Sequence, residues 1–447
     1  MKNLLNKIWL LVDFSKKGVK STIGKNILSL YVLQISYYIL PLITIPYLVR
    51  VLGPEKFGLV SFGQSLIAFF VLFVSYGFDL TATRSISVNR DDKEAVNRIT
   101  SSVWAVKVLL SVTGILILLL LSQFIQKINE ILFLLIILYG IVIGQVLFPR
   151  WLFQGKEKMG AISIINITVR GISTAGIFLL IRDPKDFLLY AGILSFQGVG
   201  TGILGTWYVL KKFGVSLVMP SWINIKDAFI EGGTLFVSNL SMALYNTGNS
   251  FILGLLTNYT YVGYYSAAEK MVMALVGLFR PISSAFFPRF SKIASTSKSE
   301  VLLWGYRLMY IMGGLGLLTS VFIFLAAPII VKLVLGEGYE PSIMVLRVLS
   351  AIPLLLSVSD VFSIQLMLPF GKDKVYSLIR VIAGPLHIVL AILIVPKLFA
   401  AGMSLTFVIT EIFIVSSTFL YLWYCQLTPF HYKSENSLYQ KTKKVSL

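Results

Sequence analysis

Two stretches, "WLFQGKEKMG" at residues 151–160 and "LPFGKDKVYS" at residues 368–377, decide how this chain is organised. Each contains Gly-Lys-acid-Lys directly after a long apolar run. The second copy begins at Gly371, 216 residues after the first copy begins at Gly155. A motif that recurs at about half the length of a chain predicts an internal repeat.

The composition places the chain in a membrane. Of its 447 residues, 56% are hydrophobic and only 13% are charged, whereas soluble proteins carry about a quarter charged residues. A helix that spans a bilayer needs roughly 20 apolar residues, and nearly all of the sequence between Asn26 and Trp423 divides into such runs. The sequence therefore predicts an all-α polytopic membrane protein.

The net charge of +19 does not indicate a nucleic-acid partner, because the basic residues lie in the short breaks between apolar runs. That placement reports orientation in a bilayer. One cysteine, Cys425, and two histidines cannot supply a closed zinc site. We expect no metal and no cofactor.

Twelve transmembrane helices are predicted, and the basic residues test this division. Alternate breaks hold 27 and 7 Lys and Arg residues, with five more inside spans. The richer set should be cytoplasmic, so both termini are predicted to be cytoplasmic. The segment 324–336 could extend the ninth span or form a separate interfacial piece. The predicted spans are 26–47, 57–80, 102–122, 130–149, 160–181, 187–210, 232–256, 262–286, 302–326, 342–369, 375–396 and 399–423.

The halves of the chain align at more than the tetrad. When "FGLVSFGQSL" from Phe57 is set over "VGYYSAAEKM" from Val262, Gly58 meets Gly263 at an offset of 205 residues. At the same offset Ser61, Gln64 and Arg84 meet Ser266, Glu269 and Arg289. We expect two six-helix pseudo-symmetric lobes around a central cavity. The predicted divisions are an amphipathic cytoplasmic lead-in (1–25), an N-lobe (26–210), a cytoplasmic linker (211–231), a C-lobe (232–423) and a cytoplasmic tail (424–447).

Each tetrad is then the cytoplasmic turn between the fourth and fifth helices of a lobe. Its glycine is expected to end the helix and to supply a backbone angle that other residues resist. Its lysines keep the turn on the cytoplasmic side.

Ionisable residues deep inside spans are the main functional candidates, because each costs several kcal/mol unless it is paired or faces water. Arg170 and Lys270 are candidates for a substrate cavity. Lys107, Arg347 and Arg380 lie near enough to interfaces to reach polar surroundings. The candidates for proton or sodium coupling are Glu269, Asp360, Glu411 and His387.

Four other residues are cavity candidates. Arg84 and Arg289 stand at predicted cytoplasmic helix ends, where they could gate the cavity or bind phosphate, and where anchoring to lipid headgroups explains them equally well. Asn246 and Asn249 flank Gly248 and indicate a polar, broken helix segment, although interhelical hydrogen bonding is an alternative.

Motifs of soluble nucleotide-binding enzymes do not apply. "GTGILG" at residues 200–205 fits a dinucleotide pattern, but it lies in an apolar helix with no strand before it. There is no phosphate-binding loop, so direct use of ATP is not expected.

Three segments resemble a known family. "YLVRVLGPEKFGLVSFGQ", "WLFQGKEKM" and "VGYYSAAEKM" look like the polysaccharide transporter family, the O-antigen-type flippases, over nearly the whole chain. The resemblance implies the fold of the multidrug, oligosaccharidyl-lipid and polysaccharide exporter superfamily. It also implies a substrate, an undecaprenyl-diphosphate-linked oligosaccharide moved from the cytoplasmic to the outer leaflet of a bacterial inner membrane. Membrane lipids, a polysaccharide polymerase and a chain-length regulator are the expected partners.

Three alternatives remain open. A lipid II flippase shares the superfamily fold but has fourteen helices. A multidrug antiporter of the superfamily should favour an acidic lumen, whereas the deep charges here include Arg and Lys. A membrane-embedded polymerase or ligase usually needs a sizeable periplasmic loop, and every predicted outer loop is short.

Overall fold

The computed structural model describes residues 22–430, so most of the predicted lead-in and tail lies outside the described residues. Every regular element within 22–430 is helical, which confirms the all-α prediction. The α-helices are α3 (Thr22–Ser75), α4 (Phe78–Val88), α5 (Lys93–Phe124), α6 (Gln126–Glu130), α7 (Leu132–Leu138), α8 (Gly140–Leu147), α9 (Arg150–Gly155), α10 (Met159–Leu180), α11 (Phe187–Lys212), α12 (Trp222–Asn246), α13 (Asn249–Leu256), α14 (Tyr259–Gly277), α15 (Arg280–Ala294), α16 (Lys298–Ile330), α17 (Ser342–Leu349), α18 (Ile352–Asp360) and α19 (Asp373–Tyr424). A 3-10 turn, η1 (Pro184–Asp186), and two π-helical segments, η2 (Val331–Leu335) and η3 (Val361–Met367), complete the set.

Two very long helices are broken near their middles. α3 breaks at Gly53, where φ is 69°, and α19 breaks at Phe399, where φ is 50°. Positive φ is unfavourable for a bulky residue. The Phe399 ring stacks on Tyr261 with centroids 4.5 Å apart, and this contact helps to hold the strained residue. Predicted spans one and two, and eleven and twelve, are therefore separated by a backbone break instead of a loop.

The number of apolar helices differs from the prediction of twelve. Among the described residues, eight helices are long and apolar enough to cross a membrane, or nine if the bent pair α14 and α15 counts as one span. Two of the eight each take in parts of two predicted spans: Leu40–Val88 covers 57–80 and the end of 26–47, and Asp373–Tyr424 covers 375–396 and 399–423. The predicted seventh span is divided between α12 and α13. The structure confirms a multi-span helical protein, while the count of twelve stays a prediction because composition does not reveal bends and breaks.

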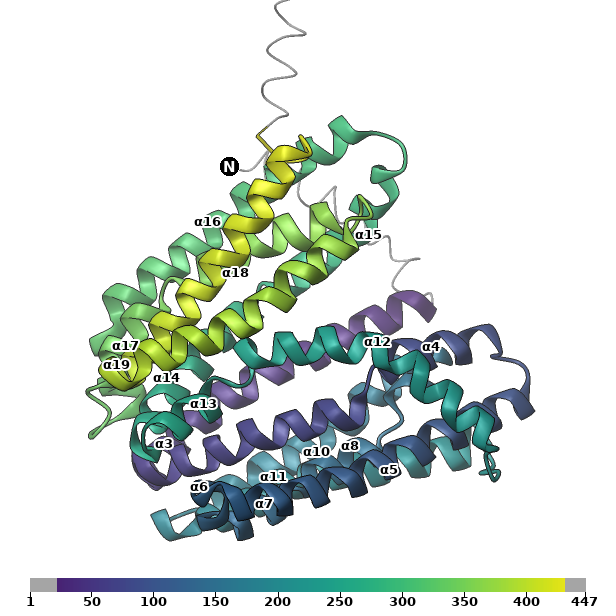
Figure 1. The fold of residues 1–447 in the computed structure, drawn as a ribbon, viewed down its shortest axis with the longest axis horizontal. Coiled ribbons are helices and arrows are strands. Elements are labelled where there is room, and N and C mark those ends of the chain that lie inside the picture. The colour runs from purple at the N-terminus through teal and green to yellow at the C-terminus, as the bar shows by residue number, and fades with distance from the viewer. Residues whose placement is uncertain (1–21, 431–447) are drawn as a thin grey trace, which may run out of the picture.

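Helices from the two halves of the chain gather separately. In Figure 1, α5, α7, α8, α10 and α11 lie together, α16 to α19 lie together, and α3 and α14 lie between the groups. The uncertain segment 324–336 extends the ninth predicted span, because α16 runs to Ile330 and η2 follows directly.

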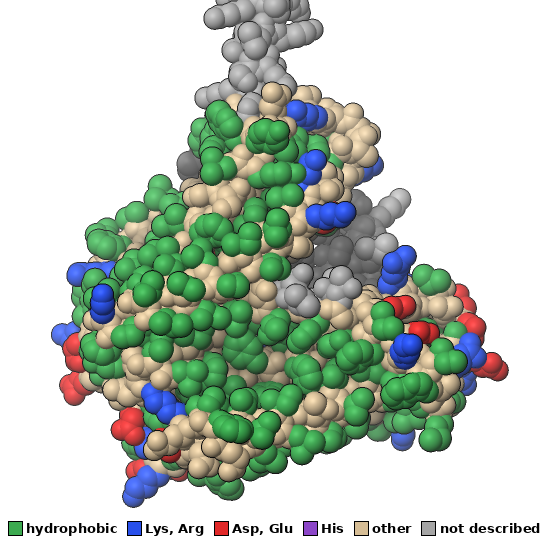
Figure 2. All heavy atoms as spheres, viewed as in Figure 1, with side chains coloured by type: hydrophobic (Ala, Val, Ile, Leu, Met, Phe, Trp, Pro, Cys, Tyr) green, Lys and Arg blue, Asp and Glu red, His purple; other side chains and the backbone are tan. Residues whose placement is uncertain are grey.

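The outer surface suits a bilayer. Figure 2 shows hydrophobic side chains over the middle of one face and charged side chains gathered towards its ends. Leu120 and Leu318 are among the large apolar side chains that the protein exposes, at 58% and 70%. Such exposure would be unfavourable in water but is suited to lipid.

α3 and α14 pack through the two glycines that the repeat aligns. A Cβ atom added to Gly58 would overlap the carbonyl oxygen of Tyr259, and one added to Gly263 would overlap the carbonyl oxygen of Pro54. The 205-residue offset relates Gly58 to Gly263 and also Pro54 to Tyr259. The contact is reciprocal, as contacts across a two-fold axis are. Glycine is required because the two backbones approach so closely.

Two further contacts join the halves on the side predicted to face outward. Lys127 Nζ, from α6, donates to the carbonyl oxygens of Gly254 (2.8 Å), Leu255 (3.1 Å) and Thr257, where α13 ends. Arg50 of α3 donates to the carbonyl oxygen of Leu333 in η2. α6 and η2 occupy residues 126–130 and 331–335, so they too are related by the offset of 205.

The two tetrads form turns, as predicted, but their glycines differ in role. Gly371 has a φ of 67°, whereas in the first turn Glu157 has the positive φ, 56°. The prediction that glycine supplies the unusual angle is therefore wrong for Gly155. A Cβ there would lie 2.5 Å from the Ile86 side chain of α4, so Gly155 serves close packing.

The first turn is fastened to the end of α4 by charge. Arg90 Nη2 lies 2.7 Å from Glu157 Oε1, and Lys156 donates to the Arg90 carbonyl oxygen. The hydrogen bond from Arg90 lowers the pKa of Glu157, and the charge of Arg90 acts in the same direction.

This ion pair predicts a small pH-dependent effect on stability. A carboxyl with a lowered pKa stabilises the fold above its unfolded pKa of about 4.3, and loses that contribution as the pH falls through its folded pKa. We expect Glu157→Gln to lower the melting temperature slightly at pH 7 and not at all once the pH lies below the folded pKa. Melting curves of the purified wild type and variant, at pH 7 and at a pH below the folded pKa of Glu157, test this. An equal difference in melting temperature at both pH values would contradict it.

Candidate functional site

A cavity of about 700 Å³ lies within the second half of the chain, and we call it the C-half cavity. Its walls come from α12, α14, α15, α16, α18, η3 and α19. The volume lies in the range of roughly 300–1,000 Å³ that is typical of small-ligand sites. Six residues supply its main polar and charged groups: Asn246, Arg280, Asp360, Tyr376, Arg380 and Glu411.

Two arginines and two carboxylates face this common space. Arg380 is held by Tyr376, since its guanidinium lies 3.6 Å from the ring centroid and its Nη1 donates to the Tyr376 carbonyl oxygen at 3.4 Å. Glu411 is only 2% exposed. Among the described residues, no ion pair within 4.0 Å joins either arginine to Asp360 or Glu411. Arg280 is exposed, Asp360 and Arg380 are half-buried, and Glu411 is buried. Charges of both signs that line one cavity without pairing to each other are typical of a site that receives a polar ligand.

A second polar cluster, the interface network, joins α3, α13 and α14. Lys270 Nζ lies 3.1 Å from Gln64 Oε1 and 3.4 Å from Ser61 Oγ, and 4.9 Å from the centroid of the Phe57 ring. A lysine of the second half is therefore bonded to the first half.

Glu269, next to Lys270, has partners of its own in this network. Its Oε1 accepts from Asn249 Nδ2 at 2.9 Å and from the Tyr265 hydroxyl at 2.7 Å. The hydroxyls of Ser250 and Ser266 lie 2.7 Å apart. Two uncharged donors of the second half hold this carboxylate, next to the lysine that bonds to the first half, and Glu269 does not line the C-half cavity.

The break at Thr247–Gly248 separates the two candidate asparagines. Asn246 ends α12, is exposed and lines the C-half cavity. Asn249 begins α13 and is only 1% exposed. One asparagine therefore faces the cavity and the other belongs to the interface network.

The remaining candidates lie apart from the cavity lining. Arg170 is half-buried in α10, in the first half. His387 is fully buried, and its Nδ1 lies 2.9 Å from Thr410 Oγ1 within the broken helix α19. Arg84 is exposed on α4, and Arg289 packs 3.8 Å from the centroid of the Trp304 ring. The functional roles predicted for these four stay predictions.

The sequence argument missed the two cavity arginines. Arg280 is not among the residues that the sequence singles out, and Arg380 is expected from the sequence to reach towards an interface. Lys107 also differs from its prediction, because it is 1% exposed and donates to the Gln145 carbonyl oxygen at 2.6 Å. Near-uniformly apolar helices carry little information on which face is buried, so no sequence signal identified these orientations.

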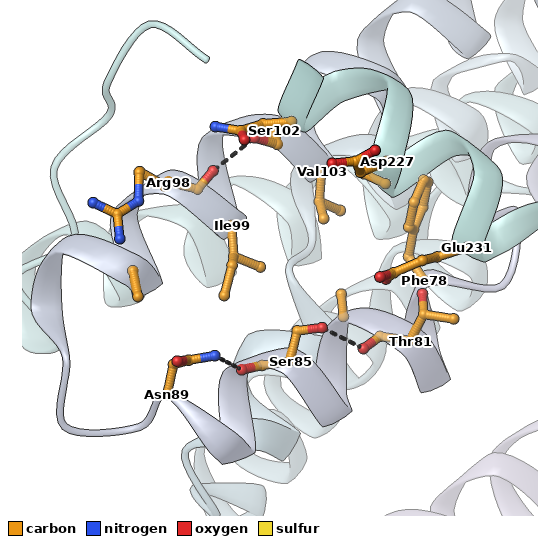
Figure 3. Close-up of a pocket in the computed structure, with 14 residues that line it drawn as sticks. Phe78, Thr81, Ser85, Asn89, Arg98, Ile99, Ser102, Val103, Asp227 and Glu231 are labelled. Carbon is orange, nitrogen blue, oxygen red and sulfur yellow. Dashed lines mark hydrogen bonds between the residues drawn. The ribbon is translucent and has the colours of Figure 1, made fainter. Parts of the chain in front are cut away.

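A smaller groove of about 330 Å³ lies between α4, α5 and α12. In Figure 3, Asp227 and Glu231 of α12 approach it opposite Thr81 and Ser85 of α4. The Ser85 hydroxyl donates to the Thr81 carbonyl oxygen of its own helix at 3.2 Å. No cluster of three or more His, Cys, Asp or Glu residues suited to a metal occurs in the described part of the chain.

Comparison with known sequences gives one family and two relatives that share a name. Residues 23–294 match a family described as "Polysaccharide biosynthesis protein". A protein of Escherichia coli strain K12 is 32% identical over 406 residues, covering 90% of this chain and 97% of its own length. A protein of Shigella dysenteriae is 29% identical, covering 88% and 98%. Both relatives bear the name "Putative O-antigen transporter".

Comparison with solved structures identifies the fold. The structure of "Lipid II flippase MurJ" in an inward closed conformation matches with a TM-score of 0.71 at 13% identity, over 92% of this chain and 89% of that one. An inward-facing transporter of the multidrug resistance MATE family matches with a TM-score of 0.67 at 16% identity, over 88% and 96%. This chain therefore has the fold shared by these two kinds of transporter.

Proposed function

The chain belongs to the polysaccharide biosynthesis protein family, and from this premise we propose that it flips undecaprenyl-diphosphate-linked oligosaccharide repeat units across a bacterial inner membrane. Members of this family and its named relatives are transport proteins, so the chain is not an enzyme. The proposed direction is from the cytoplasmic to the periplasmic leaflet, for synthesis of O-antigen or another surface polysaccharide.

The observation that supports this proposal best is the C-half cavity. A sugar diphosphate cannot cross hydrocarbon without a polar path, whereas a polyprenyl tail can remain in lipid. Arg280 and Arg380 place two cations on the wall of this cavity, and guanidinium groups bind phosphate oxygens in a bidentate manner. An organic-cation antiporter should favour an acidic lumen, whereas this cavity is lined by as many arginines as carboxylates.

Rocking of the two halves is the proposed transport movement. The reciprocal packing of Gly58 and Gly263 supports a pivot on a pseudo-two-fold axis. Lys127 and Arg50 hold the halves together on the predicted outer side, so both contacts must break when that side opens.

Removal of the Lys127 contact should favour the outward-open state. Lys127→Met leaves the last carbonyl oxygens of α13 without their cationic donor, a favourable placement at a helix C-terminus. We expect faster labelling of a cysteine introduced by Leu256→Cys with a membrane-impermeant maleimide, in protein carrying Cys425→Ser. Lys185→Met, at an exposed outer position, is the matched control. An unchanged labelling rate would contradict the role of Lys127.

We further propose proton or sodium coupling, with Glu269 as the leading candidate because its neighbour Lys270 makes the hydrogen bonds to the first half. The proposed partners are the lipid-linked substrate, membrane lipids, the polysaccharide polymerase and the chain-length regulator. Both termini are proposed to be cytoplasmic.

The function is tested by deleting the gene in its host and locating the completed lipid-linked oligosaccharide. Accumulation in the cytoplasmic leaflet, reversed by the wild-type gene, is the expected result. Normal translocation with altered drug tolerance would favour an antiporter, and normal translocation with altered polymer length would favour a polymerase.

A further inference from the structure

We propose that the C-half cavity binds the first sugar of the substrate as well as its diphosphate. Asp360 and Glu411 accept hydrogen bonds from sugar hydroxyls, and Arg280 and Arg380 bind the diphosphate. This inference rests on the proposed function. It assigns a recognition role to two carboxylates that the sequence alone indicated as candidates for ion coupling.

The separation of charges in the cavity carries the argument. Carboxylates that served only to neutralise the arginines would be expected in direct contact with them. Instead, no described ion pair within 4.0 Å joins these groups, although all four line one space. Both signs of charge therefore remain available to a ligand.

One carboxylate oxygen of Asp360 has unused hydrogen-bonding capacity. Asp360 lines the cavity, and its Oδ2 is buried in the wall without a hydrogen-bond partner among the described residues. Buried polar atoms are normally satisfied, so a rotation of this carboxylate towards a bound ligand would supply the missing bond.

The chemistry of the ligand matches both kinds of group. A diphosphate esterified at both ends carries about two negative charges, which two guanidinium groups can balance. Sugar hydroxyls donate well to carboxylates, which are acceptor-only when ionised. Arg280 begins α15 and lies near the predicted cytoplasmic end of span 262–286, and Glu411 lies near the middle of predicted span 399–423 in α19. The cavity is therefore expected to extend inward from the side where the substrate is made.

The test compares two lipids bound to the purified full-length protein, measured by native mass spectrometry. One is undecaprenyl diphosphate. The other is the undecaprenyl-diphosphate-linked oligosaccharide that accumulates in the deletion strain. Asp360→Asn and Glu411→Gln should each lower the affinity for the sugar-bearing lipid about tenfold, which is the effect of losing one charged hydrogen bond. The affinity for undecaprenyl diphosphate should not change. Arg280→Gln and Arg380→Gln should lower the affinity for both lipids.

Glu337→Gln and Lys374→Gln, at exposed positions outside the cavity, are the matched controls. If Glu411→Gln fails to fold, Asp360→Asn alone tests the inference, because Asp360 is less deeply buried and its substitution should disturb folding less. The inference is wrong if Asp360→Asn and Glu411→Gln lower the affinity for both lipids equally, or lower it for neither. Failure of the proposed function is a separate result, because the deletion strain would then accumulate no oligosaccharide in its cytoplasmic leaflet.

Discussion

Gly58→Leu should abolish transport and sharply reduce the yield of folded protein. A single Cβ at this position already overlaps the Tyr259 carbonyl oxygen, and backbone cannot yield as a flexible side chain can. Overpacking a buried contact costs about 1–3 kcal/mol and occasionally more, and here α3 would be driven away from α14 at the contact between the two halves. The measurement is the yield of monodisperse protein together with rescue of the deletion strain.

Repeat symmetry and an uncrowded glycine provide the controls. Gly263→Leu should be equally damaging, because its Cβ overlaps the Pro54 carbonyl oxygen. Gly313→Leu in α16 should be tolerated, since a Cβ there meets no atom within 4 Å. A folded, active Gly58→Leu protein would refute the close packing of α3 and α14.

Lys270→Met should lower transport by about 100-fold while the protein remains folded. Lys270 is the cation of the interface network, bonded to Gln64 and Ser61 of the other half. Lys270 is half-buried, and removing one partner of a charged hydrogen bond costs about 2–5 kcal/mol where the bond is buried. The proposed substrate path between the halves would also lose a positive charge. Initial rates of repeat-unit export, with melting temperature measured alongside, test the prediction.

A second substitution separates two explanations for Lys270. If Lys270 only fastens the halves, Gln64→Leu should cause a similar loss, because it removes the shorter of the two hydrogen bonds. If Lys270 also contacts the diphosphate, Gln64→Leu should be much milder. Lys185→Met is the exposed control, and wild-type export by Lys270→Met would contradict both explanations.

The repeat was predictable because it rests on residue identities that geometry constrains. Gly58 and Gly263 recur because only glycine permits their reciprocal backbone contact. The same 205-residue offset, derived from "FGLVSFGQ" and its counterpart, relates α6 to η2. The Gly-Lys-acid-Lys tetrads likewise mark turns, although Glu157 takes the backbone angle expected of Gly155.

The lining of the cavity was not predictable in the same way. Depth along a span follows from residue counting, which drew attention to Asp360 and Glu411, and both line the cavity. Residue counting does not tell which way a side chain faces around the helix axis, because apolar residues occupy every side of these helices. His387 is at a similar depth to Glu411, yet it packs against Thr410 while Glu411 faces the cavity. Arg380 faces the cavity because Tyr376, one turn earlier, supports it.

Reconstitution of the purified protein into liposomes tests the central claim most directly. Undecaprenyl-diphosphate-linked oligosaccharide from the deletion strain would be incorporated in both leaflets, and an added glycosidase would cleave only the glycans exposed outside. Liposomes containing the wild-type protein should allow nearly all of the glycan to be cleaved, because inner-leaflet lipid is flipped outward as the outer pool is consumed. If cleavage stops at the fraction reached in protein-free liposomes, this protein is not a flippase for that lipid.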